Sequence, residues 1–161
     1  MDRIDHISLL GQYYGEGPLA AALECWGLKQ HPRIPRDELK TSIALPEMGI
    51  ELTFTDERAL DVQFRSYPDG ALVLTNIFFH AMKTDQHGAY EGDLPLNLSF
   101  SFDKTELISC LGEPDIVGLD GTLMRFDRPQ YFVSVQTDDS GHIAIVGVQA
   151  ARKATLKGTV S

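Results

Sequence analysis

The chain has 161 residues, of which 43% are hydrophobic and 23% are charged, a composition typical of one folded globular domain and unlike that of a disordered chain. Its net charge of −9 disfavours nucleic acid and anionic membranes as partners and favours a basic protein, although solubility alone also accounts for such a charge. The sequence contains no apolar run of the roughly 20 residues that a transmembrane helix needs.

The N-terminal segment 1–17 lacks the long apolar core of a signal peptide, which favours a cytoplasmic protein. It is expected to be an irregular arm or a short helix. Residues 19–28 are rich in helix formers, and Pro18 suits a first helical turn. The face of this helix that is expected to be buried carries Leu19, Ala22, Leu23 and Trp26.

Strands are predicted next, at 41–45, 50–55, 60–64 and 71–81. The second and third alternate in hydrophobicity and are predicted to form a hairpin, with Asp56 and Glu57 at its exposed tip. The nearly continuous apolar character of 71–81 predicts a central position in a sheet. Residues 83–93 form a polar loop.

Residues 94–115 are predicted to form a strand followed by a short helix that ends at a glycine and a proline. Leu96, Leu98, Phe100 and Phe102 alternate with smaller or polar residues, which is the period of a strand buried on one face. A capping box begins the helix, with Asp103 as N-cap and Glu106 three residues later. Gly112 ends the helix, and Pro114 prevents its continuation.

The remaining strands are predicted at 122–126, 131–136 and 142–148. A loop at 115–121 precedes the first of them, and an acidic turn at 138–141 joins the last two. The tail, 151–161, is expected to be frayed. On the outer face of the sheet, Phe132 lies among polar residues, as in a protein-binding surface.

The two halves of the chain repeat one order of elements. A helix ends near Gly27 and another near Gly112, and strands with an acidic tip follow each. We therefore expect one α+β domain, 1–161, built from tandem repeats at 18–81 and 94–150. Paired, the repeats would make one antiparallel sheet with helices packed on one face. Chance similarity between two α+β segments is the alternative.

Patterns typical of catalysis or of cofactor binding are absent from the sequence. The five histidines have no zinc-ligand spacing, and no serine or cysteine lies in a nucleophile motif. Cys25 and Cys110 are expected to be reduced and buried. No metal, cofactor or enzymatic activity is therefore predicted.

The motif at 94–115, followed by the strands up to Val148, resembles the C-terminal half of bacterial immunity proteins encoded beside polymorphic or type VI-delivered toxins. The shared pattern is Leu-Pro-x-x-Leu-x-Phe-Ser, a short helix, Leu-Gly-x-Pro-Asp, an aspartate-rich turn and a final apolar strand. The matching residues before the strands are Leu94, Pro95, Leu98, Phe100, Ser101, Leu111, Gly112, Glu113, Pro114 and Asp115.

The resemblance covers about the last third of the chain, and the Leu-Gly-x-Pro part also occurs in two other families. These are outer-membrane assembly lipoproteins and tandem-repeat β-lactamase inhibitor proteins. The chain lacks the lipobox cysteine of the former and the disulfides of the latter, but its two-copy architecture is similar to that of the inhibitors.

The resemblance implies a non-enzymatic immunity protein that binds a cognate toxin in the cytoplasm and docks an acidic surface over a basic active-site cleft. Two alternatives stay open: a scaffold module similar to the outer-membrane assembly lipoproteins, and an enzyme with an unrecognised site. The residues expected to contact the partner are Asp56, Glu57, Asp85, Tyr90, Glu91, Asp93, Phe132, Asp138 and Asp139.

Overall fold

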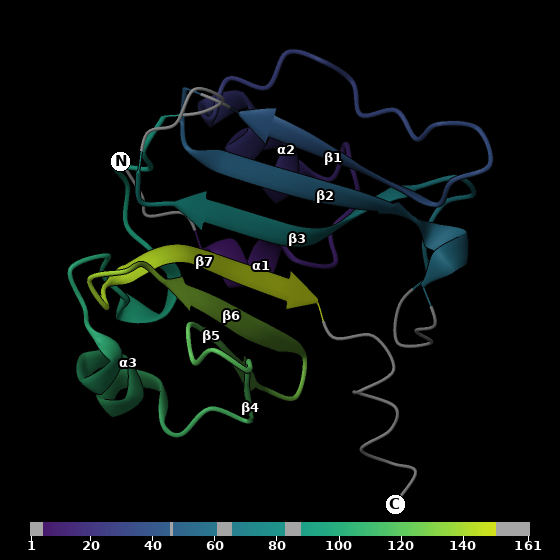
Figure 1. Cartoon of the computed structure of the whole chain (residues 1–161). Helices are drawn as coiled ribbons and strands as arrows, with labels where there is room; N and C mark the ends of the chain where they lie inside the picture. The colour runs from purple at the N-terminus through teal and green to yellow at the C-terminus, as the bar shows by residue number, and fades with distance from the viewer. Residues whose placement is uncertain (1–4, 46, 61–65, 83–87, 151–161) are drawn as a thin grey trace, which may run out of the picture.

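The structure, a computed structural model, describes residues 5–45, 47–60, 66–82 and 88–150. In these residues it is an α+β protein with a seven-stranded antiparallel sheet in the order β1-β2-β3-β7-β6-β5-β4 (Figure 1). The helices are α1 (His6–Leu9), α2 (Gly17–Cys25) and α3 (Lys104–Leu111). The strands are β1 (Lys40–Leu45), β2 (Ile50–Asp56), β3 (Leu72–His80), β4 (Ile116–Val117), β5 (Leu123–Asp127), β6 (Tyr131–Thr137) and β7 (Ile143–Ala150).

The sheet consists of two antiparallel runs of strands that meet in its middle. β1, β2 and β3 follow one another from one end, and β4, β5, β6 and β7 follow one another from the other end. Strands β3 and β7 close the gap, from Asn76 opposite Gln149 to His80 opposite Ile145. The prediction that 71–81 is an interior strand is therefore confirmed.

One face of the sheet carries the hydrophobic core. Ile77 and Phe79 on β3 lie opposite Val148 and Val146 on β7, and all four side chains are fully buried. Helices α1 and α2 lie behind the sheet in Figure 1. Residues of the helices and of the position after α2 belong to the same buried cluster. They are Leu9 from α1, Leu19, Ala22 and Leu23 from α2, Trp26 just after α2, and Leu107 from α3. The predicted buried face of 19–28 is thus confirmed.

The predicted helix start at Asp103 is confirmed in detail. The Asp103 carboxylate accepts a hydrogen bond from the Glu106 amide at 2.9 Å, and the Glu106 carboxylate accepts one from the Asp103 amide at 3.0 Å. At the other end of α3, Gly112 has a φ of 90°, a conformation that side-chain-bearing residues rarely adopt. Local chemistry therefore defines both ends of this helix.

The predicted strand at 94–102 is wrong. Pro95–Asn97 form a single 3₁₀ turn, in which Leu96 and Asn97 have φ values of 61° and 60°. Proline has no amide hydrogen and a fixed φ, so it favours a turn here over an interior strand. The apolar side chains are buried all the same, because Leu94 and Leu98 both enter the core from the turn.

Two further predictions need correction or lie beyond the described residues. The expected loop at 115–121 contains the short strand β4, which pairs with β5. β2 pairs with β1 and β3, and after Asp56 the chain turns into a 3₁₀ helix, Glu57–Ala59. The predicted hairpin partner at 60–64 falls mostly on 61–65, outside the described residues.

Candidate functional site

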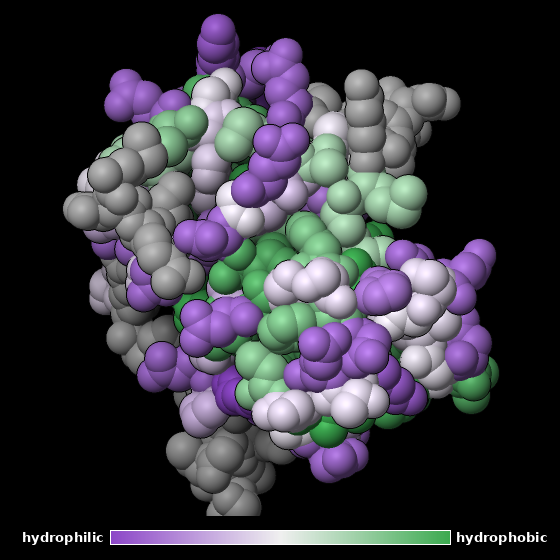
Figure 2. Space-filling view, turned by 90° about the vertical axis from the view of Figure 1, so that its left-hand side faces the viewer, coloured by the Kyte–Doolittle hydropathy of each residue, from purple (hydrophilic) through white to green (hydrophobic). Residues whose placement is uncertain are grey.

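An open cavity of about 780 Å³ lies where β1 and β3 end and β2 begins. This is the left-hand side of Figure 1, which Figure 2 turns towards the viewer: hydrophobic surface gathers in the middle of that side, with hydrophilic side chains around it. We call the cavity the His6 pocket. The residues that line it are Asp5, His6, Ser8, Leu9, Pro18, Ala21, Ala22, Cys25, Trp26, Glu47, Met48, Ala89, Tyr90, Glu91, Gly92 and Asp93.

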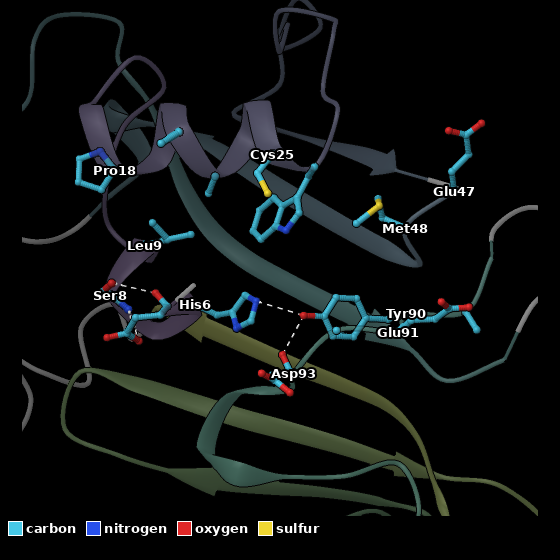
Figure 3. A pocket seen from close by; sticks show the side chains of 16 residues that line it. His6, Ser8, Leu9, Pro18, Cys25, Glu47, Met48, Tyr90, Glu91 and Asp93 are labelled. Atoms are coloured by element: carbon cyan, nitrogen blue, oxygen red, sulfur yellow. Dashed lines mark hydrogen bonds between the residues drawn. The ribbon is translucent and has the colours of Figure 1, made fainter. Parts of the chain in front are cut away.

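Aromatic rings form the buried floor of the His6 pocket. The His6 ring is parallel to Trp26, with their centroids 6.0 Å apart, and it meets Phe79 edge-on at 4.8 Å. Figure 3 shows His6 and Tyr90 pointing towards each other across the floor; the Tyr90 hydroxyl lies 3.5 Å from His6 Nε2. His6, Trp26 and Tyr90 are each less than 10% exposed, so their rings form a buried aromatic base.

The Tyr90 hydroxyl is held in its neutral form. It donates a hydrogen bond to the backbone oxygen of Asp93 at 2.8 Å, which closes the segment 90–93 into a compact turn. Burial, and secondarily the nearby Asp93 carboxylate, raise the pKa of Tyr90 to about 12. At neutral pH Tyr90 therefore acts as a hydrogen-bond donor and a packing group.

A glycine in the β1–β2 turn lets the segment 88–90 lie against the sheet. Gly49 has a φ of 68°, and a Cβ atom at this position would overlap the backbone of Gly88, Ala89 and Tyr90. The crossing is held by two backbone hydrogen bonds, from His80 N to Gly49 O at 2.9 Å and from Tyr90 N to His80 O at 2.8 Å. These contacts place Tyr90 and the acidic residues after it beside the cavity.

Exposed carboxylates surround the cavity. Asp5 comes from the N-cap of α1, Glu47 from the β1–β2 turn, and Glu91 and Asp93 from the segment after β3. Among the described lining residues none is lysine or arginine. The His6 pocket thus combines an apolar aromatic floor with an edge of negative charge from three separate segments.

The structure brings together three of the predicted partner-binding residues, Tyr90, Glu91 and Asp93. Tyr90 is buried, whereas the two acids are exposed. The neighbours Asp5 and Glu47 and the floor residues His6 and Trp26 were not predicted as site residues, and no local motif marks them. Asp85 lies outside the described residues.

Asp56 is not at an exposed tip, so that prediction is wrong. It is 8% exposed, because it caps the 3₁₀ helix Glu57–Ala59 through the Arg58 amide at 2.9 Å and pairs with the Arg58 guanidinium at 3.0 Å. The hydrogen bond from the Arg58 side chain is the largest of the effects that lower the pKa of Asp56. Glu57 is half-buried beside it.

Asp138 is used by its own turn, as the predicted turn chemistry implies. Its carboxylate accepts hydrogen bonds from the Ser140 hydroxyl at 2.6 Å, the Ser140 amide at 2.9 Å and the His142 amide at 3.1 Å. The Ser140 hydroxyl is the main cause that lowers the pKa of Asp138. Asp139 beside it is exposed.

Phe132 lies on the sheet face opposite the core, since it alternates along β6 with the buried Val133. The Arg125 guanidinium lies over the Phe132 ring, 4.5 Å from its centroid. Ser134 and Gln136 follow on the same face, half-buried and exposed respectively. The predicted mixture of aromatic and polar groups on this face is confirmed, and it is separate from the His6 pocket.

The cysteines differ from expectation. Cys25 and Cys110 are free thiols, but both are exposed, so the prediction that they are buried is wrong. Cys25 lies at the last turn of α2 and lines the His6 pocket (Figure 3). Within the described part of the chain, no three metal-ligating side chains converge, and no helix has the length and apolarity to cross a bilayer.

Comparison with known proteins adds a distant structural similarity. No protein-family model matches the sequence, and no curated protein matches it. A crystal structure of a DUF4309 family protein (YjgB) from Bacillus subtilis is similar over 82% of this chain and 77% of its own, with 14% identity and a TM-score of 0.43.

Proposed function

We propose that this chain is a non-enzymatic immunity protein, which acts in the cytoplasm and neutralises a cognate toxin by docking its acidic surface over a basic active-site cleft. The observation that carries the proposal is the His6 pocket. There, carboxylates from three segments of the chain surround one open apolar cavity whose described lining has no lysine or arginine.

Electrostatics favours a basic protein partner on this side. A net charge of −9 attracts a cationic partner at long range and accelerates encounter, and charge complementarity at the contact suppresses wrong partners. The apolar centre of the pocket also suits a protein partner, because the desolvated middle of a protein interface is typically enriched in aromatic residues and methionine and its margin is polar. Trp26, Tyr90 and Met48 fit the centre, and Glu47 and Glu91 fit the margin.

The proposal includes a tandem fold for the chain, with repeats at 18–81 and 94–150 and the helices packed on one face of the sheet. The sheet order supports it, because successive antiparallel strands follow one helix in each half, three after α2 and four after α3, and the last strands of the halves, β3 and β7, pair with each other. Gly27 and Gly112, which follow these helices, both have positive φ values. We expect both helices of such an arrangement to pack on the core side of the sheet.

The direct test is protection of cells. The chain is co-expressed with each toxin-like product encoded beside its gene, and growth is compared with and without it. We expect one product to be lethal alone and harmless with the chain, and the pair to co-purify. The Glu91→Lys/Asp93→Lys double variant should lose protection, whereas Asp139→Lys, which changes an exposed acid away from the pocket, should keep it. Protection against none of these products would overturn the proposal.

A further inference from the structure

We infer that the His6 pocket is a socket for one segment of the partner chain, in which an apolar side chain is flanked by lysine or arginine. The inference rests on the proposed function, since the toxin is the partner that would supply the segment. The volume, the floor and the edge of the pocket each select a different property of that segment.

The size of the pocket selects a segment over a single small group. A volume of about 780 Å³ lies within the range of sites that enclose drug-sized ligands, and it exceeds the volume of any one side chain. The pocket is open to solvent, so a segment of a partner chain can lie across it. Two or three consecutive residues of a partner fit this space.

The floor selects an apolar anchor. Leu9, Ala22 and Trp26 come from the helices, and Met48 faces them from the β1–β2 turn. The Tyr90 hydroxyl in the floor already donates to the Asp93 backbone, so a ligand is not needed to satisfy it. The flexible side chain of Met48 can adapt to anchors of different shape.

The edge of the pocket selects positive charge on either side of that anchor. Glu91 and Asp93 lie on one segment, and Asp5 and Glu47 come from two others. A cation on a long, flexible stem reaches such carboxylates while its methylene groups cover apolar surface. A neutral segment would lack this attraction, and an acidic one would be repelled.

The protein carries its own reporter for this site. Trp26 is the only tryptophan of the chain and lines the pocket, so its fluorescence reports on occupancy without labelling. The probe is the peptide acetyl-Arg-Leu-Leu-Arg-amide, titrated into the full-length chain at low salt. Two matched peptides test the parts separately: acetyl-Gln-Leu-Leu-Gln-amide lacks the charge, and acetyl-Arg-Ser-Ser-Arg-amide lacks the anchor.

We expect a saturable change in fluorescence with the first peptide and binding about tenfold weaker or more with each control peptide, because both the ion pairs and the anchor contribute. The Glu91→Gln/Asp93→Asn variant should lose most of this difference between the charged and uncharged peptides. Ala21→Leu narrows the cavity from an exposed position of α2 and should weaken binding of all three. Asp139→Asn should change nothing.

Equal binding of the three peptides, no saturable change, or an unaltered affinity in Ala21→Leu would overturn the inference. So would binding only by a chain shortened to begin at Asp5, since the cavity would then be covered by the protein's own N-terminal residues. The two proposals fail separately. Protection of cells without peptide binding leaves the immunity function and removes the socket, and peptide binding without protection does the reverse.

Discussion

The segment 90–93, which follows β3, and the turn 138–141, which joins β6 to β7, are both acidic, yet their carboxylates have different roles. Asp138 accepts three hydrogen bonds from Ser140 and His142, so its charge serves the turn itself. Glu91 and Asp93 instead lie at the edge of a cavity, in a segment that the hydrogen bond from the Tyr90 hydroxyl to the Asp93 backbone oxygen closes into a turn. The Asp138 carboxylate therefore belongs to its own turn, whereas Glu91 and Asp93 border an apolar cavity that a partner can enter.

Substitution of a glycine that contacts the first region or lies within the second should have the largest effect on stability. Gly49→Ala should lower the free energy of unfolding by about 3 kcal/mol, since the new Cβ combines a positive φ with an overlap against the backbone of residues 88–90. Gly141→Ala, where φ is 88° and no atom lies near the added carbon, should cost only about 1 kcal/mol. Urea unfolding of both variants measures the difference; similar losses would mean that the 88–93 segment is not held against Gly49.

The next largest effect concerns partner affinity. Glu91→Lys/Asp93→Lys should weaken the proposed toxin complex about 30-fold, because reversed charges at the contact repel a basic partner and slow association. Asp138→Asn/Asp139→Lys should change the affinity by less than about twofold, since these residues lie outside the proposed contact. Surface plasmon resonance at two salt concentrations tests both. Equal losses at the two sites would contradict a contact centred on the His6 pocket.

Tyr90→Phe removes the hydrogen bond that closes the acidic segment, and should cost about 1 kcal/mol at pH 7. Its pH dependence has a definite sign. Because burial raises the pKa of Tyr90 from 10.0 to about 12, the neutral side chain stabilises the folded state fully below pH 10, and this stability is lost as the pH rises through 12. The free energy of unfolding, measured from pH 9 to 12, should fall less steeply in the variant than in the wild type.

Asp138→Ala should have the smallest effect, a fall in the thermal midpoint of about 2 °C, because the lost hydrogen bonds lie at the surface. The lowered pKa of Asp138 implies stability that is present above the usual pKa of 3.8 and is lost as the pH falls through the lower folded value. The difference in midpoint between variant and wild type should therefore shrink below pH 4. A constant difference would show that the turn does not depend on the charged carboxylate.

The local elements of this protein follow from its sequence. The Asp103–Glu106 capping box, the α2 helix after Pro18 and six of the seven strands depend on torsion preferences, hydrogen bonds between near neighbours and alternation of apolar residues, all of which are properties of short segments. The exception among the strands, β4, has only two residues and therefore too short a pattern to detect. The same alternation gave a wrong strand at 94–102, where Pro95 favours a turn.

The candidate site depends on the tertiary structure. His6 and Tyr90 are 84 residues apart in sequence, and their rings meet because β3 carries the chain back to the β1–β2 turn and Gly49 allows the crossing. The sequence marked Tyr90, Glu91 and Asp93 as partner-binding residues but treated Asp56 and Asp138 as their equals. Whether a carboxylate faces a cavity, an arginine or its own backbone is decided by long-range packing, about which the neighbouring residues in the chain carry little information.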